Sequence, residues 1–144
     1  MILPDANLLL YSINIDSPDH EAAFRWWSGL LKSGNPVGLY SGVAFAFLRL
    51  STNRRVFSVP LTVEQTFEYL NNWLSFSTVR WVDAQVDDLR VAEALLREAG
   101  TGGNLVSDAQ IAAAAIRLKA TVHTADMDFG RFRNVTWINP LATR

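Results

Sequence analysis

The chain has 144 residues, of which 49% are hydrophobic and 19% charged, and this predicts one globular domain with a substantial core. Thirteen basic and 14 acidic residues give a formal net charge of -1, which is not the basic balance of proteins that bind nucleic acid mainly through phosphates. The absence of cysteine excludes disulfides, thiolate metal sites and thiol nucleophiles. No apolar run approaches the roughly 20 residues of a membrane span. A strand-like segment starts directly after Met1, so we expect a cytoplasmic protein without a signal peptide.

The first third of the chain predicts a strand and two helices. Ile2-Leu3 is typical of a short strand, and Asp5-Ala6-Asn7 predicts a turn into a brief helix. Ser17-Pro18-Asp19 predicts the start of the next helix, with serine as N-cap and proline at the first helical position. Gly34 predicts its end. The apolar face that we expect on this helix comprises Ala22, Ala23, Trp26, Trp27, Leu30 and Leu31.

The middle of the chain continues this alternation. Val37–Tyr40 predicts a second strand, and residues 43–50 are apolar almost all round, which favours a buried helix. Thr62 and Gln65 predict a capping box for another helix, and Val79–Val82 predicts a third strand. The face that we expect this capped helix to bury comprises Val63, Phe67, Leu70 and Leu74.

The last third predicts two helices and two strands. A helix closed by Gly100 should bury Leu89, Ala92, Leu95 or Leu96, and Ala99, and residues 107–119 form the clearest helix, with four consecutive alanines for close packing. Residues 121–124 and 135–138 are strand-like. About five strands with helices between them indicate a single α/β domain over residues 1–144 with a mostly parallel sheet.

Three aspartates flank elements that should meet at one edge of this sheet. Asp5 follows the first strand, Asp126 follows a late strand, and Asp108 lies in the first turn of the Ala-rich helix. Such positions gather at the carboxyl edge of a parallel sheet. Because converging carboxylates raise each other's pKa, we expect Mg²⁺ or Mn²⁺ to bind there. A bound ion of this kind activates water for phosphodiester hydrolysis, and no cysteine, paired histidine or GxSxG motif offers covalent catalysis.

Each of these acids also has a structural interpretation. Asp5 could cap the short helix that follows it, and Asp108 would stabilise the N-terminus of any helix. Asp126 and Asp128 could make local hydrogen bonds in a turn. The metal-site hypothesis therefore depends on the acids lying together.

The order of these motifs resembles PIN domains. Asp5-Ala6-Asn7 lies at the N-terminus, Ser107-Asp108-Ala109 opens an Ala-rich helix, and Thr124-Ala125-Asp126-Met127-Asp128-Phe129 follows a strand. Phe47-Leu48-Arg49 and the ending Trp137-Ile138-Asn139-Pro140 are similar to one branch of the VapC-type toxins of bacterial toxin–antitoxin pairs. The resemblance covers nearly the whole chain.

This resemblance implies a PIN-like three-layer α/β/α sandwich and a Mg²⁺- or Mn²⁺-dependent endoribonuclease that attacks structured RNA, often tRNA. It also implies a homodimer that is silenced by a small antitoxin protein, segments of which enter the acidic cleft. Asp5, Asp108 and Asp126 match the catalytic, metal-binding acids of the family. Asn7 matches the polar residue that supports the first acid, and Thr124 matches the hydroxyl beside the last.

One position departs from the family pattern. The family places a glutamate in the helix after the second strand, and the matching residue is Ala46, which offers no ligand. We therefore expect one well-held ion and at most a weak second one. Asp128 is a further candidate ligand, although an exposed turn aspartate is the simpler interpretation.

Two other functions compete with the nuclease. The main alternative is a PIN fold with an impaired site that binds RNA or an antitoxin without cleavage, and Ala46 keeps it open. A receiver-like phosphoacceptor domain is disfavoured, because no adjacent acidic pair follows the first strand and no lysine lies near a late strand.

Basic side chains offer weaker candidates. Arg54-Arg55, Arg131 and Arg133 could face phosphates near the acidic cleft, although a solvated surface is the simpler interpretation. His20 and His123 are isolated, and a lone histidine is more often a packed or surface residue than a ligand.

Overall fold

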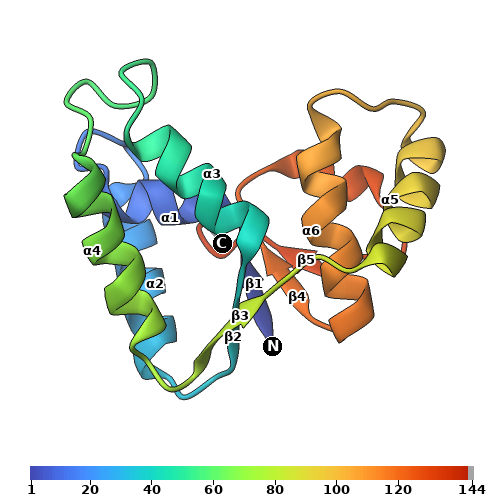
Figure 1. The fold of residues 1–144 in the computed structure, drawn as a ribbon, viewed down its shortest axis with the longest axis horizontal. Coiled ribbons are helices and arrows are strands. Elements are labelled where there is room, and N and C mark those ends of the chain that lie inside the picture. Colours follow the sequence, from blue (N-terminus) through green and yellow to red (C-terminus); the bar gives the residue numbers. More distant parts are fainter. Residues whose placement is uncertain (143–144) are drawn as a thin grey trace.

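The computed structural model describes residues 1–142, and within them five parallel strands form one sheet in the order β3-β2-β1-β4-β5. The strands are β1 (Ile2–Pro4), β2 (Val37–Tyr40), β3 (Val79–Val82), β4 (Thr121–His123) and β5 (Trp137–Ile138). The helices are α1 (Ala6–Ile13), α2 (His20–Lys32), α3 (Ser41–Ser51), α4 (Val63–Leu74), α5 (Val86–Ala99), α6 (Leu105–Leu118) and the 3-10 helix η1 (Met127–Arg131). The helices α1 to α4 lie on one side of the sheet and α5 and α6 on the other (Figure 1). This confirms the predicted three-layer α/β/α fold.

The strand order creates a topological switch beside β1. The chain runs from β1 outward to β2 and β3, and then returns to β4 and β5 on the opposite side of β1. Ile2 is in register with Val37 on one side and with Thr121 on the other. In open parallel sheets the crevice at the carboxyl ends of such diverging strands is the usual ligand site.

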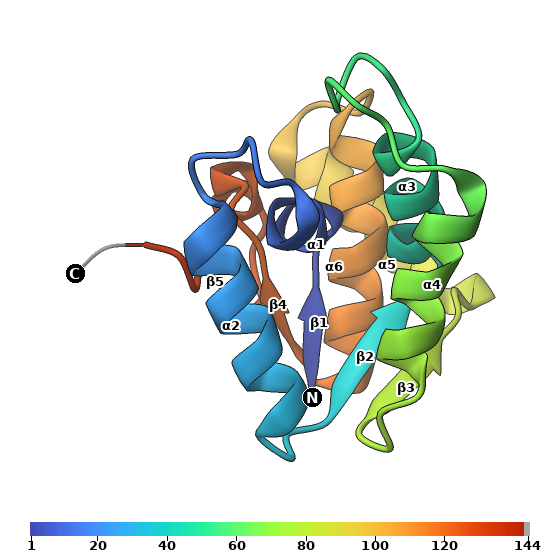
Figure 2. The same ribbon diagram turned by 90° about the vertical axis from the view of Figure 1, so that its left-hand side faces the viewer.

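The centre of the sheet is buried on both faces. Leu3, Val37, Leu39 and Val122 are 0–1% exposed, as expected where helices cover both sides of parallel strands. In α6 the four consecutive alanines, 112–115, are also 0–1% exposed. Their small side chains let this helix pack close to β4, on the side of the sheet that lies behind it in the view of Figure 2. The prediction of a closely packed Ala-rich helix is confirmed.

The predicted start of the second helix is two residues too early. α2 begins at His20, because residues 17–19 form a local turn in which the Ser17 hydroxyl accepts from the Asp19 amide at 3.2 Å. Ser17 is therefore not the N-cap. Ala22, expected on the apolar face, is exposed, and the fully buried part of that face comprises Ala23, Trp27, Leu30 and Leu31.

The capping box of α4 is confirmed, but of its predicted buried face only Leu70 is buried. The Gln65 amide donates to the Thr62 hydroxyl at 3.1 Å and the Thr62 amide donates to the Gln65 side chain at 2.9 Å. The buried residues of this helix are Thr66, Leu70 and Trp73, whereas Val63, Phe67 and Leu74 are 60%, 45% and 38% exposed. A hydrogen bond between the buried hydroxyls of Thr66 and Ser51 turns Thr66 toward α3.

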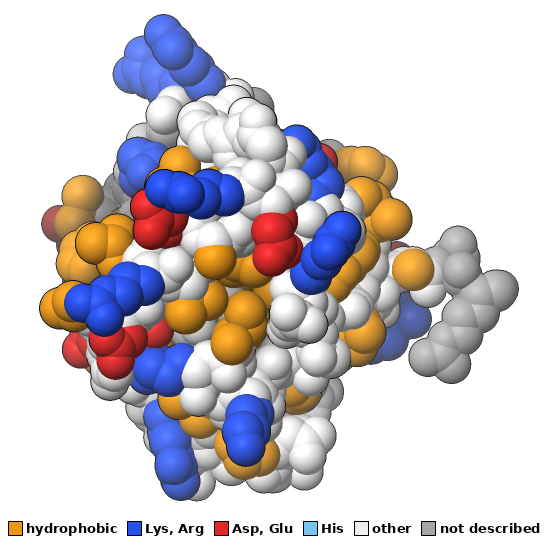
Figure 3. Space-filling view, turned by 90° about the vertical axis from the view of Figure 1, so that its right-hand side faces the viewer, with side chains coloured by type: hydrophobic (Ala, Val, Ile, Leu, Met, Phe, Trp, Pro, Cys, Tyr) orange, Lys and Arg blue, Asp and Glu red, His pale blue; other side chains and the backbone are white. Residues whose placement is uncertain are grey.

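A polar residue also displaces the predicted face of α5. Leu89 is 73% exposed, whereas Asp88 is buried because it pairs with Arg117 of α6. Leu95 is the buried apolar residue of this helix. The face of the molecule that α5 and α6 form consequently shows apolar side chains among charged ones (Figure 3).

The last two strands are shorter than predicted. β5 spans only Trp137–Ile138, so the last strand is shorter than the predicted 135–138, and β4 ends one residue earlier than predicted, at His123. Within residues 1–142, no helix combines the length and hydropathy that a membrane crossing needs.

Candidate metal centre

A pocket of about 220 Å³ lies at the carboxyl edge of the sheet, at the switch between β1 and β4. Asp5 directly after β1, Asp108 in the first turn of α6, and Asp126 three residues after β4 all line it. Ala46 and Arg49 of α3 also line it. The fold thus brings Asp5 together with two acids that lie more than 100 residues later in the chain.

The Asp5 carboxylate is held in place by hydrogen bonds to both of its oxygens. Asp5 is the N-cap of α1, and its Oδ1 accepts a hydrogen bond from the Ala6 amide at 2.7 Å. Its Oδ2 accepts from the Thr124 hydroxyl at 2.8 Å. Burial raises the pKa of this carboxyl, the two hydrogen bonds lower it, and the charge of Asp126 raises it further. The capping interpretation of Asp5 is therefore compatible with a place in the pocket.

Thr124 connects the first and last acids. Its fully buried hydroxyl donates to Asp5, accepts from the Asp126 amide at 2.9 Å, and accepts from the Asn7 side-chain amide at 3.3 Å. The Asn7 side-chain oxygen in turn accepts from the Ala125 amide at 3.3 Å. These contacts fix the loop after β4 against the start of α1. Thr124 orients the acids from outside the pocket, whereas Asn7 also lines it.

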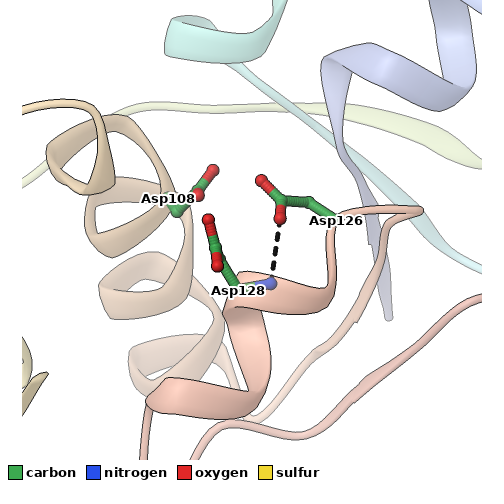
Figure 4. Close-up of side chains that lie close together, drawn as sticks. All are labelled: Asp108, Asp126 and Asp128. Atoms are coloured by element: carbon green, nitrogen blue, oxygen red, sulfur yellow. Dashed lines mark hydrogen bonds between the residues drawn. The ribbon is translucent and has the colours of Figure 1, made fainter.

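The most compact group of carboxylates is Asp108, Asp126 and Asp128. One oxygen from each lies within 4.8 Å of the others, and the three side chains converge from α6 and from the start of η1 (Figure 4). Asp126 is the N-cap of η1, because its Oδ1 accepts from the Asp128 amide at 2.9 Å. Asp128 is exposed and does not line the pocket, so it contributes from the rim.

Asp108 carries the strongest electrostatic signature of the site. Burial, as the largest cause, and the neighbouring charges of Asp5, Asp126 and Asp128 together raise its pKa from 3.8 to about 7. Two of these acids cannot ionise together at low cost without a cation. A donor set of carboxylate oxygens alone suits a hard divalent ion such as Mg²⁺ or Mn²⁺.

The helix α3 contributes to the pocket an alanine where an acidic residue was expected, and a basic residue that was not expected. Ala46 lies at the position where the family pattern predicts a glutamate, and its methyl group offers no ligand. Arg49, one turn later on the same helix, is a pocket residue that our sequence reasoning missed. The signal was present, because residues three apart on a helix share a face, and Ala46 was already expected at the site.

The basic clusters that the sequence suggested do not line this pocket. Arg54, Arg55 and Arg133 are exposed elsewhere, and the Arg131 guanidinium donates to the Ala99 carbonyl at 3.1 Å. A role for them in binding RNA stays a prediction.

Of the two isolated histidines, His123 is a packed residue. Its side chain is buried, its Nδ1 lies 3.2 Å from the Trp26 indole nitrogen, and burial lowers its pKa to about 4. The His20 ring nitrogen lies 2.9 Å from the Tyr11 carbonyl. Neither belongs to the carboxylate group.

Comparison with known proteins agrees with this fold. The family model of the PIN domain matches residues 2–135. Ribonuclease VapC33 of Mycobacterium tuberculosis is 38% identical over 141 residues, which cover 98% of this chain and 99% of the relative. Ribonuclease VapC37 of the same species is 37% identical over 142 residues, with 99% of each chain covered.

Solved structures of low sequence identity share the fold. Mycobacterium tuberculosis VapC20, a sarcin–ricin loop cleaving toxin, superposes with a TM-score of 0.69 at 19% identity, covering 94% of this chain and 99% of that one. VapBC2 from Rickettsia felis, bound to a DNA fragment from their promoter, gives a TM-score of 0.68 at 24% identity, with 96% and 98% covered.

Proposed function

Since this chain belongs to the PIN-domain family, as an endoribonuclease of the VapC type, we propose that it hydrolyses RNA phosphodiesters with the help of a bound Mg²⁺ or Mn²⁺ ion. One observation carries the metal requirement. Three carboxylates meet in one pocket, where burial and the charges of the neighbouring carboxylates together raise the pKa of Asp108 to about 7. A divalent cation would relieve the repulsion among these carboxylates, and among the described residues that line the pocket only Arg49 carries a positive charge.

Asp108 and Asp126 are the proposed principal ligands, with Asp128 able to approach from the rim. Asp5 completes the negative charge of the site and is oriented by Thr124. When bound, such an ion lowers the pKa of a water molecule and stabilises negative charge that develops on a phosphate. Because Ala46 supplies no carboxylate, we propose one well-held ion and at most a weak second one.

The proposed substrate is structured RNA, with tRNA as the first candidate to test. The family resemblance supports this choice, and so does VapC20, which cleaves the structured sarcin–ricin loop. We also propose that the protein is the toxin of a toxin–antitoxin pair, that it forms a homodimer, and that a small antitoxin protein silences it. Co-purification with the product of a short neighbouring gene would test the partner, and light scattering of the purified protein would test the dimer.

The decisive experiment is RNA cleavage by the purified protein. Wild-type protein should cleave total tRNA with Mn²⁺ present and should stop when EDTA is added. Asp126→Asn should lose at least about 100-fold in rate, because the neutral amide neither attracts the ion nor neutralises its charge. Asp87→Asn is the matched control, since Asp87 is exposed in the first turn of α5 outside the pocket. Cleavage that survives both EDTA and Asp126→Asn would refute the metal mechanism.

A PIN module that binds without cleaving is the second candidate function, and the observation that favours it is Ala46. It predicts that wild-type protein binds tRNA in a gel-shift assay but releases no fragments at any Mn²⁺ concentration. Cleavage that depends on Mn²⁺ would exclude this candidate.

A further inference from the structure

Arg49 is a cation in a pocket that is otherwise acidic. Of the described residues that line the pocket, Arg49 is the sole basic one, and it shares this lining with Asp5, Asp108 and Asp126. It lies in the last turn of α3, one turn after Ala46. Its guanidinium enters none of the hydrogen bonds or ion pairs formed within residues 1–142. Its five N–H donors are therefore available to a ligand.

A positively charged side chain in the pocket would offset the negative charge that remains when an RNA phosphate enters beside the carboxylates. A divalent ion compensates for two of the carboxylates at most, and a phosphodiester brings one more negative charge into the same 220 Å³ pocket. The planar guanidinium donates two parallel hydrogen bonds to phosphate oxygens. A fixed donor aimed at oxygens that gain charge during the reaction also lowers the barrier of the chemical step.

We propose that Arg49 binds a phosphate of the RNA substrate at the mouth of the acidic pocket, and so positions the backbone of the RNA next to the carboxylates. This inference rests on the proposed function. It differs from a general basic surface, because Arg54 and Arg55, which follow α3, do not line the pocket. The competing interpretation is that Arg49 merely stabilises the C-terminus of α3, where a cation is favourable.

Four proteins test this proposal: wild type, Arg49→Gln, Arg49→Lys and the control Arg25→Gln. Arg25 lies on the exposed face of α2 and pairs only with Glu21 at 3.7 Å, so its loss should leave RNA cleavage unchanged. With tRNA and saturating Mn²⁺, Arg49→Gln should lower kcat/KM by roughly 100-fold, as the loss of one charge-stabilising donor does in other enzymes. Arg49→Lys should recover part of this loss, because lysine keeps the charge but not the bidentate geometry.

Binding provides an arm that does not depend on cleavage. The affinity for a fluorescein-labelled RNA hairpin is measured by anisotropy across a salt series, with Ca²⁺ in place of Mn²⁺. For Arg49→Gln, the slope of log affinity against log salt should fall in magnitude by roughly one relative to wild type. The midpoint of thermal unfolding should stay within a degree or two, which shows that the variant is folded.

These readouts separate the two hypotheses. If wild-type protein fails to cleave, the proposed function falls, and the change in salt slope still decides the role of Arg49. Cleavage within twofold of wild type together with an unchanged slope would overturn the inference. An unchanged slope with weakened Mn²⁺ binding would also overturn it, because Arg49 would then act on the carboxylates and not on the RNA.

Discussion

Thr124 shows how a single side chain can organise a site without entering it. Its hydroxyl is fully buried and joins Asp5, Asp126 and Asn7, which come from opposite ends of the chain. A hydroxyl suits this place because it donates once and accepts twice. Valine has the same shape but can do neither.

Thr124→Val should therefore weaken both the fold and the metal site. The substitution leaves the Asp126 amide and one Asp5 oxygen without partners, at a cost of about 1–3 kcal/mol in the free energy of unfolding. Loss of an orienting residue should also weaken Mn²⁺ binding by roughly 10- to 100-fold. Urea unfolding and Mn²⁺ calorimetry measure the two effects. Thr124→Ser, which keeps the hydroxyl, should retain metal affinity, and equal losses in both variants would contradict this role.

The raised pKa of Asp108 predicts the pH dependence of the metal-free protein. Folding shifts this pKa from 3.8 to about 7, so over the interval between these values the folded state holds a proton that the unfolded chain has lost. The resulting stabilisation is complete below about pH 4 and disappears as the pH rises through about 7. In EDTA, the free energy of unfolding should fall by about 1–2 kcal/mol from pH 5 to pH 8, a value reduced for solvent screening of this partly exposed group.

The control for this prediction is Asp108→Asn, which does not titrate and should lose that part of the pH dependence. Saturating Mn²⁺ should also remove it from wild type, because the ion replaces the proton. Stability attributable to Asp108 that increases with pH would contradict the assignment.

At the scale of elements, a buried ion pair connects α5 to α6 and thereby supports the helix that carries Asp108. Arg117 donates to both oxygens of Asp88, at 2.8 and 3.0 Å, and to the Asp83 carbonyl at 2.9 Å. Burial raises the pKa of Asp88, but the hydrogen bonds and charge of Arg117 outweigh this effect and lower it. The carboxylate is therefore ionised and paired at neutral pH.

Asp88→Ala should destabilise the protein by about 3 kcal/mol, because it leaves the partly buried Arg117 without its partner. The matched control is Glu93→Ala on the same helix. Its exposed pair with Arg97, at 3.1 Å, should contribute at most about 0.5 kcal/mol. Chemical unfolding of both variants measures the difference. If both variants lose the same free energy of unfolding, the buried pair does not stabilise the contact between α5 and α6 more than an exposed pair would.

This pair also explains why the sequence predicted the existence of α5 but not its orientation. Apolar periodicity placed Leu89 inside, whereas the bidentate contact with Arg117 buries Asp88 and leaves Leu89 exposed. In α4 the bond between Thr66 and Ser51 has the same effect. In each pair the two residues lie on different helices, so the pattern of hydropathy within one helix could not reveal the contact.

At the scale of the whole molecule, the sequence could predict where the acids would meet. Each of Asp5, Asp108 and Asp126 lies beside an element whose end is fixed by the parallel topology, so the rule for sheet edges was sufficient. The position of Arg49 depends on how α3 packs over that edge, and the approach of Asp128 depends on the turn of η1. Helical spacing could place Arg49 on the same face as Ala46, but where that face and the turn of η1 lie relative to the acids is a tertiary relation that local patterns do not contain.

The most direct test of the account is Mn²⁺ titration of the purified protein by calorimetry at about pH 7.5. We predict one well-held ion per chain, with Asp108→Asn and Asp126→Asn each weakening binding by at least about 10-fold, and Asp87→Asn leaving it unchanged. Absence of binding by wild-type protein, or binding that both pocket variants retain in full, would contradict the proposal that these carboxylates hold a catalytic metal.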